Sequence, residues 1–163
     1  MPETFEDLIK TRIISSSSNK IISIPKEILN TIKSQELDFV ETKAILIYNI
    51  KITYIPKEIG NLINLQKLNF SVNNIKKIPK EIGYLCNLKE LDLTCNKIRF
   101  VPKEIGKLTK LKILSLLDNQ LVELPKEIGD LHNLKELWLE FNPMSRFVKN
   151  KIYKLLPNYD SIE

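Results

Sequence analysis

Glycine is scarce in this chain, and its scarcity limits the kinds of ligand site that the chain can form. The 163 residues include only four glycines, and all four recur at one position of a repeated segment. Such a position indicates a backbone conformation or a close approach that a side chain would obstruct. No glycine remains for a loop that cradles phosphate groups. The four are Gly60, Gly83, Gly106 and Gly129.

Histidine and cysteine are equally sparse, which argues against catalysis. The single histidine, His132, shares its position in the repeat with Ile63, Cys86 and Thr109, remote from the carboxylates of the predicted strands. A nucleophile, its base and an orienting group must converge, and no such set does here. The sequence therefore predicts neither an enzyme nor a bound cofactor. Cys86 and Cys95 fall on different sides of one repeat, so we expect two free thiols, which favours a reducing compartment.

Long apolar runs are also absent. No stretch approaches the ~20 apolar residues that a membrane-spanning helix needs, and residues 2–7 lack the basic and apolar regions of a signal peptide. As written, the chain is expected in the cytoplasm. Export is the alternative, if Met1 follows a removed export signal.

The net charge of +5 raises the question of nucleic-acid binding. Each lysine of the repeated segment, such as Lys57 or Lys80, is directly followed by a glutamate. Positive charge is therefore not concentrated there, whereas a surface that binds phosphate groups needs a concentrated stripe of positive charge. We therefore expect no nucleic-acid partner. A basic excess near the C-terminus is expected to be a solvated helix face; it comprises Arg146, Lys149, Lys151 and Lys154.

A repeat of 23 residues dominates the chain. The segment Pro-Lys-Glu-Ile-Gly begins at residues 56, 79, 102 and 125, and leucines and an asparagine follow it at fixed offsets. Alternating apolar residues predict a short strand with its leucines on one side. The proline can open a helical turn, and the asparagine amide can satisfy backbone groups that the turn leaves unpaired. The columns are Leu65, Leu88, Leu111 and Leu134; Leu68, Leu91, Leu114 and Leu137; Phe70, Leu93, Leu116 and Leu139; Asn73, Asn96, Asn119 and Asn142; and Ile75, Ile98, Leu121 and Met144.

This pattern, Leu-x-x-Leu-x-Leu-x-x-Asn-x-Leu, resembles the leucine-rich repeat family in its Pro-Lys-Glu-Ile-Gly variant. The segment from Asn142 to Asn158 also looks like the closing segment of bacterial proteins of this type, particularly spirochaete ones. The resemblance implies an α/β solenoid in the form of a right-handed horseshoe. Its parallel sheet would line the concave face, with short helices or 3-10 turns on the convex face and helical caps at both ends.

The repeat predicts one domain over residues 1–163, with irregular ends. Pro25 and Pro56 are 31 residues apart, eight more than the period, so one repeat is lengthened around residues 26–41. Its asparagine position falls on Ile50, which puts the turn geometry of that repeat in doubt. The expected units are an N-terminal cap and partial repeat (1–23), a lengthened repeat (24–54), four regular repeats (55–77, 78–100, 101–123 and 124–146) and a C-terminal cap (147–163).

Function is expected on the concave face, because the residues predicted to face it differ from repeat to repeat while the leucines do not. Trp138 is the only tryptophan and is expected to face solvent as an interface anchor. The partner would be an unidentified protein. The expected binding residues are Leu46, Tyr48, Lys67, Asn69, Ser71, Glu90, Asp92, Thr94, Ile113, Ser115, Leu117, Glu136, Trp138 and Glu140.

Several alternatives stay open at this point. Trp138 could pack on Ile113, and Phe141 could tuck under the final cap. The protein could be a monomer or a weak homodimer that pairs through the concave face or through an edge strand near residues 13–17. A third alternative is a metal site built from Cys95, Asp118 and Asp92, although a structural zinc site generally uses four ligands with more sulfur or imidazole.

Overall fold

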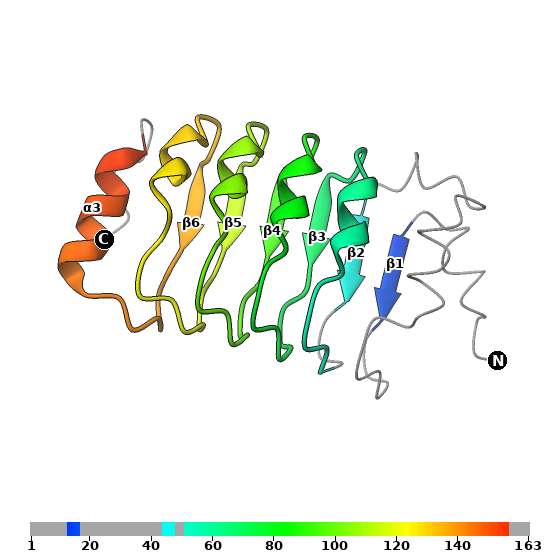
Figure 1. The fold of residues 1–163 in the computed structure, drawn as a ribbon, viewed down its shortest axis with the longest axis horizontal. Helices are drawn as coiled ribbons and strands as arrows, with labels where there is room; N and C mark the ends of the chain where they lie inside the picture. Colours follow the sequence, from blue (N-terminus) through cyan, green and yellow to red (C-terminus); the bar gives the residue numbers. More distant parts are fainter. Residues whose placement is uncertain (1–12, 17–43, 48–50, 157–163) are drawn as a thin grey trace.

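The protein, described here by a computed structural model over residues 13–16, 44–47 and 51–156, is a solenoid with one parallel sheet (Figure 1). The strands pair in sequence order, so each coil adds one strand beside the last. β1 is the terminal strand of this order, where an edge strand was predicted near residues 13–17. The strands are β1 (Ile13–Ser16), β2 (Ala44–Ile47), β3 (Lys67–Asn69), β4 (Glu90–Asp92), β5 (Ile113–Ser115) and β6 (Glu136–Trp138).

Short 3-10 helices face away from the sheet, as the repeat predicted (Figure 1). Each follows a proline whose φ is between −65° and −70°, and the proline carbonyl accepts the first hydrogen bond of the helical turn. Ile59 and Leu62 point inward and are each 1% exposed. The helices are η2 (Lys57–Asn61), η3 (Lys80–Tyr84), η4 (Lys103–Lys107) and η5 (Lys126–Asp130).

An α-helix, α3 (Arg146–Leu155), packs against η5 and covers the last coil, which confirms the predicted C-terminal cap. The Ser145 hydroxyl accepts a hydrogen bond of 3.2 Å from the Val148 amide and so begins the helix. Ile152 is buried beneath it. The predicted N-terminal helix and the lengthened segment 26–41 lie outside the described residues.

The core is the set of leucine columns, stacked from coil to coil. Leu65, Leu88 and Leu111 are completely buried. Phe70 stands at a leucine position of the repeat and is completely buried too. Because each coil buries its apolar residues only against its neighbours, the core is continuous along the solenoid. In the irregular coil, Ile45 and Ile52 lie 23 residues before Leu68 and Ile75, so they occupy core positions of the repeat, and they are 2% and 0% exposed.

The asparagine column forms a ladder inside the turns that follow the strands. The Nδ2 atom of Asn119 donates to the Leu93 carbonyl of the preceding repeat and to the Leu116 carbonyl of its own strand. Its Oδ1 atom accepts from the Ile98 amide at 3.0 Å. Asn73, Asn96 and Asn142 make corresponding bonds, so the structural role predicted for this column is confirmed.

The residue before each of these asparagines has a left-handed backbone. Val72, Cys95, Asp118 and Phe141 have φ between 51° and 55°, which is uncommon for residues with a side chain. In the irregular coil Lys51 also has a left-handed backbone, with a φ of 62°. The irregularity expected for that turn falls on residues 48–50, which lie outside the described residues. No helix in the described part of the chain is long and apolar enough to cross a membrane.

Candidate functional site

The candidate site lies on the solvent face of the sheet, opposite the 3-10 helices. The register places side chains from successive coils in straight rows across the strands. Ala44, Lys67, Glu90, Ile113 and Glu136 form one row. Leu46, Asn69, Asp92, Ser115 and Trp138 form the next. These are the rows that the sequence repeat predicted.

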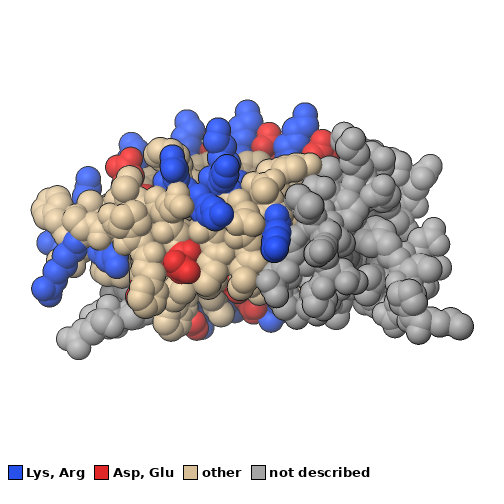
Figure 2. Space-filling view, turned by 90° about the horizontal axis from the view of Figure 1, so that it is seen from below, with Lys and Arg blue, Asp and Glu red and all other residues tan. Residues whose placement is uncertain are grey.

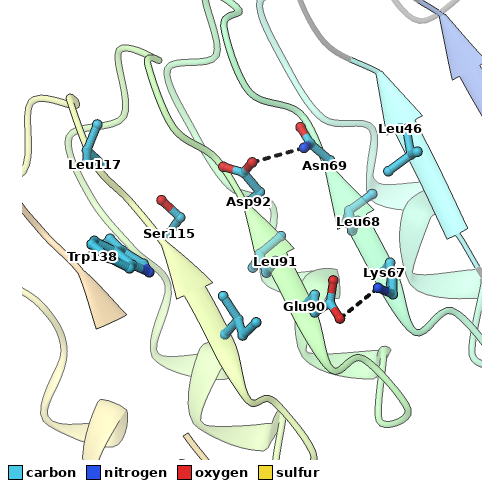
Figure 3. A pocket seen from close by; sticks show the side chains of 11 residues that line it. Leu46, Lys67, Leu68, Asn69, Glu90, Leu91, Asp92, Ser115, Leu117 and Trp138 are labelled. Atoms are coloured by element: carbon cyan, nitrogen blue, oxygen red, sulfur yellow. Dashed lines mark hydrogen bonds and ion pairs between the residues drawn. The ribbon is translucent and has the colours of Figure 1, made fainter. Parts of the chain in front are cut away.

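A hollow of about 320 Å³ runs across these rows (Figure 3). We call it the sheet hollow. Its floor includes Leu68 and Leu91, which sequence reasoning assigned to the core and did not assign to the site. Nine of the fourteen predicted site residues line it: Leu46, Lys67, Asn69, Glu90, Asp92, Ile113, Ser115, Leu117 and Trp138.

The half of the sheet hollow over β3 and β4 is polar, and its groups are already paired with one another. Lys67 Nζ lies 2.8 Å from Glu90 Oε1, and Asn69 Nδ2 donates to Asp92 Oδ2 at 2.9 Å (Figure 3). Asp92 also accepts from the Thr94 amide through its other oxygen. These side chains are therefore held in place before any partner arrives, and each pair must be matched or opened by a ligand that covers it.

The half over β5 and β6 is apolar. Trp138 is 39% exposed, which confirms that it faces solvent, and its Nε1 donates to Glu136 Oε2 at 3.3 Å. Leu117 lies just beyond the end of β5 and lines the hollow together with Trp138 (Figure 3), and Ile113 is half-buried. The tryptophan ring is thus oriented by its own strand and keeps an accessible surface, as an anchor residue needs.

Three other predicted site residues, Ser71, Thr94 and Glu136, adjoin residues of the hollow without lining it. The Thr94 and Ser115 hydroxyl oxygens lie 2.6 Å apart, and one hydroxyl donates a hydrogen bond to the other. The Ser71 amide donates to Asn69 Oδ1, and Glu136 engages Trp138. Tyr48 lies outside the described residues.

Glu140 differs most from its prediction as an exposed binding residue. Its Oε2 atom is buried and makes no hydrogen bond within the described part of the chain. Burial and the nearby charge of Glu140 raise the pKa of the Tyr153 hydroxyl on α3. Glu140 therefore lies near the C-terminal cap, because α3 covers the end of the last coil.

Phe141 is exposed, contrary to the alternative that placed it under the final cap. Its side chain is 77% accessible to solvent. The left-handed backbone at this position explains the difference, because it directs Phe141 outward while Asn142 turns inward. The idea of a buried Phe141 was therefore wrong.

The proposed metal ligands do not form a metal site. Within residues 13–16, 44–47 and 51–156, no three histidine, cysteine or acidic side chains are grouped closely enough to hold a metal ion. The Cys95 thiol instead hydrogen-bonds to Asp118, and burial, that bond and the nearby acidic charges raise its pKa. A raised pKa makes the thiolate that a metal ion would bind harder to form, so the arrangement does not favour the metal alternative. Both cysteines are free thiols.

Comparison with known proteins identifies the repeat. A family model described as a leucine-rich repeat region matches residues 27–163. The chain belongs to the leucine-rich repeat family. It is similar to a solved leucine-rich repeat protein of Leptospira interrogans, with 31% identity and a TM-score of 0.69 over 91% of this chain. The match covers 47% of the Leptospira protein, so this leucine-rich repeat chain spans less than half of that protein's length.

Other solved structures extend the comparison. A plant peptide hormone receptor, RGFR1, in complex with RGF2 has 29% identity and a TM-score of 0.64 over 75% of this chain and 19% of its own. An internalin of Listeria monocytogenes, with 24% identity and a TM-score of 0.62 over 86% of this chain and 38% of its own, shares the fold. No curated protein matches the chain in sequence. Bacterial leucine-rich repeat proteins are thus among its structural relatives, as the Pro-Lys-Glu-Ile-Gly resemblance implied.

Proposed function

We propose that this leucine-rich repeat domain is a non-enzymatic protein-binding module whose partner occupies the sheet hollow. The observation that carries the proposal is the hollow itself, because one end presents Trp138, Leu117 and Ile113 and the other presents paired polar groups. A ligand complexed to a plant receptor of similar fold is consistent with this use of the domain. The invariant leucines provide a rigid base for residues that vary between coils.

The two ends of the sheet hollow would contribute differently. The apolar end has little to lose on desolvation, so Trp138 and its neighbours should provide most of the affinity. The pairs Lys67–Glu90 and Asn69–Asp92 satisfy one another in the free protein. They should therefore contribute to orientation and selectivity more than to affinity.

The sole tryptophan allows binding to be measured at the site itself. Partners are captured on the immobilised domain, identified by mass spectrometry and then titrated in purified form. A partner that covers the sheet hollow should shift Trp138 emission to shorter wavelength as water leaves the ring. Leu117→Ala should weaken that partner's binding roughly tenfold, and Trp138→Ala, measured by calorimetry, by about thirtyfold or more, as expected of interface anchors.

Two exposed residues on the other side of the solenoid provide matched controls. Tyr84 on η3 is 54% exposed and Ile63 is 53% exposed, and neither lines the hollow. Tyr84→Ala and Ile63→Ala should leave the affinity unchanged. If the two pairs of variants weaken binding equally, or if Trp138 emission does not change at saturation, the proposed site is wrong. Light scattering of the unbound domain separates this model from self-association, because a dimer through the sheet would occupy the same hollow.

A further inference from the structure

Four cationic side chains surround a second hollow, on the edge of the solenoid at which the strands end. This hollow has a volume of about 380 Å³ and shares no lining residue with the sheet hollow. Figure 2 views the edge, and lysine and arginine side chains gather over the middle of its described part. We call its lining the basic edge patch: Lys76, Lys77, Lys97, Arg99, Phe100 and Gln120.

The basic edge patch is not part of the repeated scaffold. The position of Lys76 holds Arg99 in the next coil but Val122 in the one after, and the position of Lys97 holds Gln120. The lysines of Pro-Lys-Glu-Ile-Gly, by contrast, recur in every regular coil, and each is followed by a glutamate. A cluster confined to two coils is not needed for coil geometry, so its charge calls for another explanation.

The charge of the basic edge patch is not neutralised within the described residues. All four cations are exposed, none of them forms an ion pair with a carboxylate in the described part of the chain, and no carboxylate lines the hollow. Arg99 Nε donates to Gln120 Oε1 at 3.1 Å, so a neutral amide orients the guanidinium while its charge stays available. A hollow lined by one sign of charge concentrates the opposite sign.

The size and lining of the patch indicate its occupant. Neighbouring coils are about 4.8 Å apart, so the three coils that line the patch span about 10 Å, or about three residues of an extended peptide. Phe100 is 64% exposed and adds an apolar wall beside the cations. Nucleic-acid binding relies on roughly six to ten phosphate contacts along a longer stripe. We propose that the basic edge patch binds an acidic segment of a protein partner, with carboxylates on the cations and an apolar side chain on Phe100.

The test uses a labelled peptide, Glu-Asp-Phe-Asp-Glu, and its neutral counterpart, Gln-Asn-Phe-Asn-Gln, in a fluorescence anisotropy titration of the whole chain. The acidic peptide should bind at least about tenfold more tightly than the neutral one at about 50 mM salt, and should weaken at about 200 mM salt. Lys97→Glu combined with Arg99→Glu should weaken its binding at least about tenfold. Lys103→Glu combined with Lys126→Glu changes the net charge equally, on the 3-10 helices, and should have less than about a twofold effect.

Further arms separate this inference from its competitors. Trp138→Ala should leave binding of the acidic peptide unchanged; a matching loss would place the peptide in the sheet hollow and overturn the proposal. Equal losses in the two charge-reversed variants would show an effect of net charge alone and would also overturn it. Tighter binding of a single-stranded DNA oligonucleotide or of phosphatidylserine vesicles than of the acidic peptide at the same salt concentration would overturn the proposal. A complete lack of binding by the acidic peptide would overturn it as well. Circular dichroism of each variant confirms that it is folded.

Discussion

The side-chain amide of Asn96 donates a hydrogen bond of 2.9 Å to the carbonyl of Phe70, which belongs to the preceding coil. The same amide donates to the Leu93 carbonyl of its own coil, and its oxygen accepts from the Ile75 amide. One buried side chain therefore satisfies backbone groups of two coils. This explains how a turn can pass through the core without leaving unpaired polar groups there.

The first prediction concerns this link. Asn96→Ala should lower the free energy of unfolding by about 3 kcal/mol, because it leaves the buried Ile75 amide unsatisfied and removes one of the two asparagine donors from each of the Phe70 and Leu93 carbonyls. The measurement is urea denaturation followed by circular dichroism. Asn87→Ala is the control: Asn87 is also joined to the preceding coil, through the Ile63 carbonyl, but at an exposed position. It should cost less than about 1 kcal/mol, and a similar cost for both variants would contradict the role of burial.

The second prediction concerns the contact between Gly106 and the next coil. A Cβ atom on Gly106 would lie 2.5 Å from the Glu127 carbonyl oxygen, in a backbone that cannot easily move. Gly106→Ala should therefore lower the free energy of unfolding by about 2 kcal/mol, as overpacked sites do. Lys107→Ala, at the adjacent exposed position of η4, should change it by less than about 0.5 kcal/mol. Thermal unfolding of both variants is the measurement. If Gly106→Ala left the stability unchanged, the coils would be able to move apart to accommodate the Cβ atom.

Much of the fold could be predicted because the period forces equivalent residues into equivalent places. Strand register, the inward leucines and the asparagine ladder all follow from the positions of Leu68, Leu91 and Asn96 in the repeat. For the four glycines, the sequence left two explanations open: an unusual backbone conformation, or a close approach that a side chain would obstruct. None has a positive φ, so close approach is the reason: Gly60, Gly83 and Gly106 lie against the next coil, and Gly129 lies against Leu155 of α3.

Other features could not be predicted, because they depend on geometry between coils. No glycine marks the left-handed turn, so Val72 and Cys95 gave no signal of their unusual backbone. The predicted rows of side chains across the strands are present, but the burial of the Glu140 Oε2 atom depends on how α3 closes the last coil. The basic edge patch had a visible signal, the pair Lys76 and Lys77, which interrupts the even distribution of charge.

The third prediction uses the strained turn. Val72 has a φ of 55° and is 48% exposed, so its branched side chain gains little by packing while its backbone is unfavourable. Asparagine tolerates this conformation, and Val72→Asn should therefore raise the free energy of unfolding by about 1 kcal/mol. Val122→Asn, at a position that is 51% exposed and is not left-handed, should give no gain. The urea concentration at the midpoint of denaturation is compared between each variant and the native protein. Equal shifts in the two variants would exclude backbone strain as the cause.

The fourth prediction concerns the Cys95 thiol, which adjoins Asp118. Burial raises the pKa of Cys95 above its ordinary value of 9.0, and the hydrogen bond to Asp118 and the charges of Asp118 and Asp92 raise it further. A raised pKa lowers the thiolate fraction at a given pH, so Cys95 should react with iodoacetamide more slowly than exposed Cys86. The rates are measured by mass spectrometry at mildly alkaline pH. Faster alkylation of Cys95 would contradict the prediction.

Asp118→Asn tests the cause of that shift. It removes one negative charge and weakens the acceptor, so the pKa of Cys95 should fall and its alkylation should accelerate, whereas Asp130→Asn on η5 should change nothing. Because folding raises this pKa, the associated stability is present below pH 9.0 and is lost as the pH rises through the folded-state pKa. The free energy of unfolding should therefore decline above pH 9.0 more steeply in the native protein than in Cys95→Ser. Parallel declines in the two would show that Cys95 titrates equally in the folded and unfolded chains.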